Sequence, residues 1–132
     1  MYEKYTQRAE KFRAIEEPHH NCAQSVFMSF APECGISEDT AYAVAKNFGG
    51  GMKVGAMCGS ITGALMAIGM LGGSDEQRAE FMQLISTAYG GDVDCAPLLR
   101  KNVEEPGKEK KPFCDGLVYK AVETVCKVMK ME

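Results

Sequence analysis

Residues 58–71 read CGSITGALMAIGML, an uncharged segment rich in glycine and alanine. No residue between Lys53 and Asp75 is charged, and the segment is long enough for a helix to cross a bilayer. Its many glycines, and its Ala, Met and Ile content, differ from the Leu- and Val-rich run of a typical span. We therefore expect a buried central helix, entered by a glycine-rich loop, and no stable membrane insertion.

Apolar residues repeat every three or four positions over most of the chain, and strand-like alternation is absent. Polar caps such as Asn21 and Ser74, together with proline or glycine breaks, divide this pattern into helices. The apolar positions of these helices predict a core that includes Val44, Val118, Val122 and Val125. The expected helices span about residues 2–15, 22–30, 37–48, 58–71, 74–88 and 114–129, with a short turn at 94–99. Asn102–Pro112 is predicted to be a solvated loop. The sequence predicts one all-α domain over residues 1–132, a bundle of about five to six helices.

Composition excludes several classes of protein. A net charge of −3 and a pI near 5.5 oppose nucleic-acid binding, which needs a clustered basic surface. Six cysteines among 132 residues fall below the roughly 8–10% that marks a small disulfide scaffold. The first residues are charged and lack the apolar region of a secretory signal. We expect a cytoplasmic protein, whose thiols stay reduced unless they have a function.

The spacing of the cysteines is informative in two ways. Successive intervals of 12, 24, 37, 19 and 12 residues leave no Cys-x-x-Cys motif, so any joint site must be assembled by the fold. Four cysteines lie at expected helix N-termini, where unpaired N–H groups and the helix dipole favour a thiolate. These four are Cys22, Cys58, Cys95 and Cys114. We expect a lowered thiol pKa at each of them, and ordinary packed or loop thiols at Cys34 and Cys126.

Nine of the fourteen glycines lie between Gly49 and Gly73, around Cys58. A helix face with so little side chain permits close packing against another helix, or the approach of a cofactor to Gly59 and Gly63. His19 and His20 stand just before Cys22 in a proline-containing turn. Exposed side chains are more typical of such a turn than metal ligands.

The segments NCAQ (Asn21–Gln24) and CGSITG (Cys58–Gly63), with single cysteines at 95 and 114, resemble the C_GCAxxG_C_C family of redox-active proteins. The resemblance covers roughly residues 5–125, although Met57 and Gly59-Ser60 depart from the Gly-Cys-Ala of the family name. It implies a cytoplasmic protein in which Cys22, Cys58, Cys95 and Cys114 act together, with an iron–sulfur site suggested for the four sulfurs. It names no substrate.

Three functions remain open at this point. The four cysteines could hold an iron–sulfur or other metal centre for electron transfer or sensing. They could instead be the catalytic thiols of a metal-free thiol–disulfide redox protein, with three pairings available. The third function is a non-redox binding or scaffold module. An enzyme of this kind would be an oxidoreductase. Its redox partner is not identified, and a homodimer is compatible with a small helical bundle.

Overall fold

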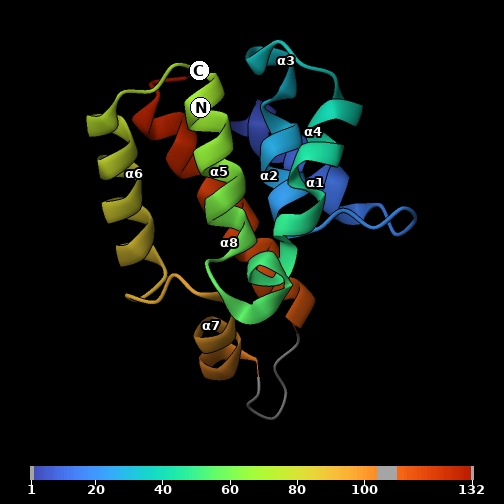
Figure 1. Cartoon of the computed structure of the whole chain (residues 1–132), viewed down its shortest axis with the longest axis vertical. Coiled ribbons are helices and arrows are strands. Elements are labelled where there is room, and N and C mark those ends of the chain that lie inside the picture. Colours follow the sequence, from blue (N-terminus) through green and yellow to red (C-terminus); the bar gives the residue numbers. More distant parts are fainter. Residues whose placement is uncertain (1, 104–109, 132) are drawn as a thin grey trace.

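The computed structural model describes residues 2–103 and 110–131, which form a bundle of helices (Figure 1). The α-helices are α1 (Glu3–Ala14), α2 (Cys22–Ser29), α3 (Ala31–Cys34), α4 (Glu38–Ala45), α5 (Gly59–Met70), α6 (Asp75–Ala88), α7 (Cys95–Asn102) and α8 (Lys110–Val128). Two short turns, η1 (Lys46–Phe48) and η2 (Gly51–Gly55), connect α4 to α5. Within the described ranges, β-type pairing is limited to one isolated bridge between Met57 and Asp94. The all-α prediction is confirmed.

Helix α5 lies at the centre of the bundle and packs against α2 (Figure 1). Its side chains at Ile61, Ala64 and Ile68 are buried, as expected for a central helix. A Cβ at Gly63 would lie 2.5 Å from the carbonyl oxygen of Ala23 in α2. The missing side chain therefore lets the two backbones come into contact.

Reciprocal hydrogen bonds fix where α2 and α6 begin. Asn21 Oδ1 accepts a hydrogen bond from the Gln24 backbone N–H at 2.8 Å, and Gln24 Oε1 accepts one from the Asn21 N–H at 2.9 Å. Ser74 and Gln77 form the same pair before α6. These bonds satisfy N–H groups that no helical carbonyl reaches. Both predicted caps are confirmed, and Cys22 occupies the first position of α2.

The described residues contain more helices than the five to six expected. Pro32 stands in the first turn of the additional helix α3, and Gly35, with a φ of 74°, ends it. The turn expected at 94–99 extends into the eight-residue helix α7. The extra helices are therefore short ones that proline and glycine separate from the longer elements.

Two finer expectations need correction or fall outside the described residues. Val44, predicted to be part of the core, is 50% exposed, because the two-turn helix α4 buries only its small residues Ala41 and Ala45. Of the loop predicted at 102–112, residues 104–109 lie outside the described ranges, and residues 110–112 belong to α8.

The glycine-rich loop before α5 makes a left-handed turn. Gly50, Gly51, Met52 and Lys53 have φ values of 63°, 62°, 58° and 63°. A Cβ at Gly51 would lie 2.3 Å from the carbonyl oxygen of Ala56, so only glycine fits there. Met52 and Lys53 carry a Cβ in a conformation that costs about 1–2 kcal/mol per residue. This turn brings the chain to the segment that precedes α5.

The described helices pack around a shared hydrophobic core to which α1, α2, α5, α6 and α8 all contribute. Val118, Val122 and Val125 of α8 are buried in it, as predicted. Among the described residues, no helix has the length and apolar character needed to cross a membrane.

Candidate functional site

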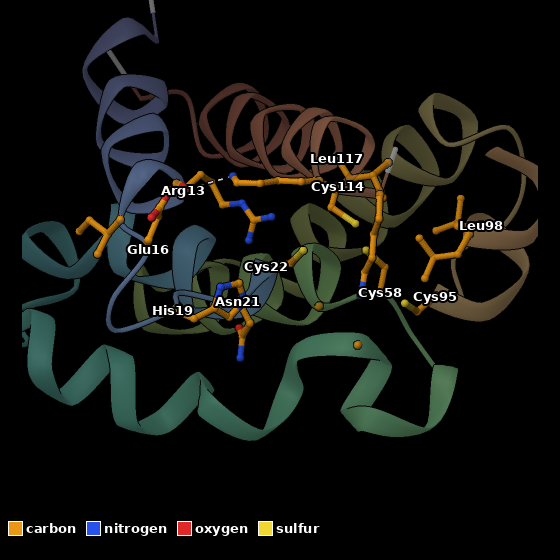
Figure 2. Close-up of a pocket in the computed structure, with 16 residues that line it drawn as sticks. Arg13, Glu16, His19, Asn21, Cys22, Cys58, Cys95, Leu98, Cys114 and Leu117 are labelled. Carbon is orange, nitrogen blue, oxygen red and sulfur yellow. Dashed lines mark hydrogen bonds between the residues drawn. The ribbon is translucent and has the colours of Figure 1, made fainter. Parts of the chain in front are cut away.

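A cavity of about 480 Å³ opens at the end of the bundle where α2, α5 and α7 begin (Figure 2). Its lining includes the four cysteines that the sequence places at expected helix starts: Cys22, Cys58, Cys95 and Cys114. Cys22 is the first residue of α2, Cys58 is the N-cap of α5, and Cys95 is the first residue of α7. Cys114 differs from the prediction, because it is the fifth residue of the described part of α8 and not its first.

The side chains of Cys22 and Cys114 both line this cavity, close enough that each shifts the pKa of the other thiol. Hydrogen bonding with Cys114 lowers the pKa of Cys22 to about 6, although burial opposes the shift. The same interaction, together with burial, raises the pKa of Cys114. The pair therefore holds one proton on Cys114 and presents a thiolate at Cys22.

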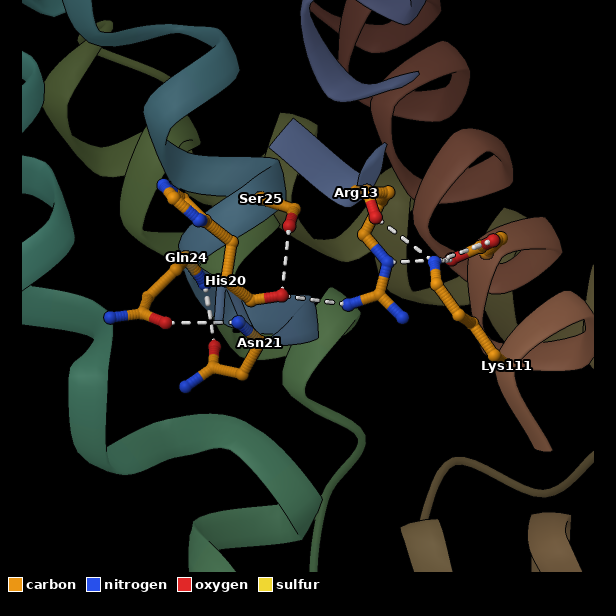
Figure 3. A network of polar contacts seen from close by, with 7 residues as sticks. Arg13, His20, Asn21, Gln24, Ser25 and Lys111 are labelled. Atoms are coloured by element: carbon orange, nitrogen blue, oxygen red, sulfur yellow. Dashed lines mark hydrogen bonds and ion pairs between the residues drawn. The ribbon is translucent and has the colours of Figure 1, made fainter. Parts of the chain in front are cut away.

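Arg13 supplies a buried positive charge beside this pair. Its side chain is 6% exposed, and its charge further lowers the pKa of Cys22. Arg13 Nε donates to Asp115 Oδ1 at 2.6 Å, and Nη1 donates to the His20 carbonyl oxygen at 2.9 Å (Figure 3). Lys111 Nζ donates to the Arg13 carbonyl oxygen at 2.9 Å. These bonds hold the guanidinium in place between α1, α2 and α8.

The isolated bridge brings Cys58 and Cys95 to the same cavity. The Cys58 N–H donates to the Val93 carbonyl oxygen, and the Cys95 N–H donates to the Ala56 carbonyl oxygen, each at 2.7 Å. Burial, followed by the negative charge of Cys22, raises the pKa of Cys58 to about 11 and also raises that of Cys95. The expected lowering at these helix starts is thus wrong, because desolvation outweighs the favourable backbone position.

Ser60, in the first turn of α5, adds a hydroxyl group to the site. Its Oγ is buried and has no nitrogen or oxygen hydrogen-bond partner within the described residues. It lies close enough to the sulfurs of Cys22 and Cys58 for hydrogen bonding to lower the pKa of both thiols. A buried hydroxyl beside two thiols is suited to donate to a thiolate.

The family model described as "Putative redox-active protein (C_GCAxxG_C_C)" matches residues 20–128. The chain belongs to this family. No curated protein and no solved structure shows a significant match to it. The match confirms the resemblance seen in the sequence and includes all four cysteines of the cavity.

A metal centre in this C_GCAxxG_C_C protein can be tested on the arrangement of its donors. Cysteine thiolates are the ligands that iron–sulfur clusters require. Yet among residues 2–103 and 110–131, no group of three or more His, Cys, Asp or Glu side chains is arranged to hold a metal ion. The described residues therefore show no ligand group for a metal ion.

The two glycines predicted to bind a cofactor have different surroundings in this family member. Gly59 lines the cavity. Gly63 instead faces the backbone of Ala23, where a side chain would meet the carbonyl oxygen. The small residues of α5 thus combine helix packing at Gly63 with access to the cavity at Gly59.

The remaining predicted candidates lie partly outside the site. His19 is exposed and lines the cavity. His20, expected to be exposed, is instead buried and stacks on Phe12 with ring centroids 5.6 Å apart. Burial raises the pKa of Cys34 and raises that of Cys126 to about 12, and neither residue lines the cavity. The surroundings of both residues agree with the prediction that they are ordinary packed or loop thiols.

Sequence reasoning missed the basic residues that line the cavity, namely Arg13, Lys110 and Lys111. The spacing of Arg13 in the sequence could have identified it. It follows Ala9 by four residues and therefore lies on the apolar face of the first helix, where both are buried. A charged residue on a buried helix face requires a partner, and Asp115 is that partner.

Proposed function

We propose that this protein catalyses thiol–disulfide redox exchange, with Cys22 as the attacking thiol and Cys114 as the resolving thiol. The observation that carries the proposal is that the two thiols share one accessible cavity, close enough to shift each other's pKa. A thiolate is the nucleophile in disulfide exchange, and a second thiol must be within reach of the mixed disulfide. The membership in a redox-active family agrees with this chemistry.

The exchange proceeds in two balanced steps. In the first, Cys22 Sγ forms a bond to one sulfur of a substrate disulfide, and the substrate S–S bond breaks. The second substrate sulfur leaves as a thiolate and takes a proton from water. In the second step, Cys114 gives its proton to solvent and attacks Cys22 Sγ, which releases the remaining substrate thiolate. The protein dithiol loses two electrons, and the substrate disulfide gains them.

The proton held by Cys114 supports this order of events. The Cys22 thiolate is one cause of the raised pKa of Cys114, both as its hydrogen-bond partner and as a negative charge. Formation of the mixed disulfide removes this charge from Cys22. The pKa of Cys114 then falls, so the resolving thiol becomes nucleophilic only after Cys22 has reacted.

Thiol trapping with peptide mapping tests the pairing. The reduced protein is equilibrated in buffers of graded thiol and disulfide content, its free thiols are blocked, and its disulfides are mapped by mass spectrometry. We expect a disulfide between Cys22 and Cys114, which is lost in Cys22→Ser and Cys114→Ser but kept in the control Cys126→Ser. A different pair, or no intramolecular disulfide at any potential, would contradict the proposal.

A second candidate function is an iron–sulfur or other metal centre, which the presence of four cysteines on one cavity favours. The described side chains show no ligand group for a metal ion, so the metal-free exchange is proposed first. Iron, sulfide and visible absorption measured on protein purified without oxygen would test the metal centre. A stoichiometric iron and sulfide content that Cys22→Ser abolishes would replace the metal-free proposal.

The cellular setting is part of the same proposal. A reducing compartment such as the cytoplasm would return the oxidised pair to the dithiol form and so allow repeated turnover. The reductant would be a thiol of the cell, acting by the reverse of the two steps above.

A further inference from the structure

The cavity beside the thiol pair is lined by more positive than negative groups. Arg13 is a buried residue of the lining, and Lys110 and Lys111 are exposed lining residues. Glu16 is the only carboxylate among the described residues of the lining. Asp115, which is not a lining residue, pairs with Arg13 and Lys111. Asp115 offsets part of the charge of Arg13 and Lys111, whereas Lys110 has no ion pair among the described residues, so the lining keeps an unpaired cation at Lys110.

The same cations act on His19. It lines the same cavity, and its pKa is lowered first by partial burial and then by the nearby cations Arg13, Lys111 and Lys110, with His20 contributing as well. These cations therefore disfavour a further positive charge at His19. An anion entering the cavity would be stabilised by these groups.

The rest of the lining is suited to a short carbon chain. Ile15, Leu98, Leu99 and Leu117 provide apolar surface around the sulfurs. The volume of about 480 Å³ falls within the roughly 300–1,000 Å³ of small-molecule sites. A molecule with an apolar middle and charged ends matches this combination of cations and leucines.

We infer that the substrate is a small disulfide that carries carboxylate groups, with the sulfurs placed at Cys22 and the carboxylates at Arg13, Lys110 and Lys111. The inference rests on the proposed thiol–disulfide function and names its substrate class. The reaction is the balanced exchange described above, in which the substrate disulfide accepts two electrons and leaves as two thiol carboxylates.

Three symmetric disulfides of similar size test the inference: anionic dithiodipropionate, neutral dithiodiethanol and cationic cystamine. The rate of Cys22 oxidation is measured for each and divided by the rate of the same disulfide with a free thiol, which removes differences in intrinsic reactivity. At low ionic strength we expect the anionic disulfide to react roughly tenfold faster than the cationic one on this scale. Added salt should reduce this ratio, since it screens the exposed lysines.

Two lysine variants test whether the preference for the anionic disulfide arises in the cavity. Lys110→Gln should lower the anionic-to-cationic ratio about threefold, whereas Lys127→Gln, an exposed residue of α8 that does not line this cavity, should leave it unchanged. Normalised rates within twofold of one another for all three disulfides, or a preference for cystamine, would overturn the substrate class and leave the exchange function intact. If none of the three oxidises Cys22, the proposed function itself fails.

Discussion

The thiols of Cys22 and Cys114 line the same cavity and shift each other's pKa, although their helices, α2 and α8, stand near opposite ends of the sequence. One thiol is the first residue of a capped helix, and the other lies more than one turn into its helix. Packing of both helices against the common core brings the two sulfurs together. Their protonation states are consequently linked.

Alkylation of Cys22 by iodoacetamide should show this linkage as a pH profile. The rate should rise with pH as the thiol ionises and reach a plateau above a midpoint near 6, the lowered pKa of Cys22. In Cys114→Ala the midpoint should rise by about one pH unit or more, because the largest cause of the lowered Cys22 pKa is removed. Cys126→Ala serves as the control and should not move it. A midpoint above 8 in the unaltered protein would contradict the thiolate assignment.

The charge of Arg13 should also affect the pH midpoint of Cys22 alkylation. Arg13→Met should raise the pKa of Cys22, because a buried cation that favours the thiolate is removed. The variant should also lose about 1–3 kcal/mol of stability, since Asp115 and the His20 carbonyl lose their partner. Arg13→Lys, which keeps the charge, should restore most of the pKa shift. The alkylation profile and urea unfolding measure the two effects separately, and an unchanged midpoint in Arg13→Met would show that Arg13 is only structural.

The order of thiol reactivity at neutral pH is a third prediction. Cys22 should alkylate faster than Cys58, whose pKa is raised to about 11 by burial and by the Cys22 charge. Mass mapping of early time points in the reduced protein measures both rates in one sample. In Cys22→Ser, Cys58 should remain slow, because burial is the main cause of its shift. Fast labelling of Cys58 in the unaltered protein would mean that the helix start, and not burial, sets its pKa.

The sequence predicts most of the helices but little of the electrostatics of the site. Asn21 and Ser74 each form reciprocal capping hydrogen bonds with a residue three positions later in the chain. Such local signals can be recognised in a single sequence. The four cavity cysteines could be grouped by family resemblance, yet their spacing alone could not place Cys22 against Cys114. Their pKa order depends on burial, which the tertiary packing decides. For this reason the rule based on helix starts fails at Cys58, and the lowered pKa of Cys22 comes from Cys114, Arg13 and Ser60.

A glycine at position 53 should relieve the backbone strain of the left-handed turn before α5. Lys53 has a φ of 63°, so Lys53→Gly should stabilise the protein by roughly 0.5–1 kcal/mol, once the greater entropy of glycine in the unfolded chain is deducted. The matched control is Lys46→Gly, where φ is −54° and glycine should instead destabilise by about 0.5–1 kcal/mol. Urea unfolding of both variants measures these changes. The same sign for both would show that backbone conformation does not control the outcome.

Two glycines of α5 give the clearest test of how the central helix packs. Gly63→Ala would place a Cβ 2.5 Å from the carbonyl oxygen of Ala23, so the helices must separate. We expect a loss of about 1–3 kcal/mol in unfolding free energy. Gly69→Ala, in the same helix, meets nothing within 4 Å and should gain roughly 0.5–1 kcal/mol from helix propensity. Because α5 and α2 both line the thiol cavity, Gly63→Ala should also shift the alkylation midpoint of Cys22, whereas Gly69→Ala should not. Equal effects of the two substitutions would contradict the close approach of α5 and α2.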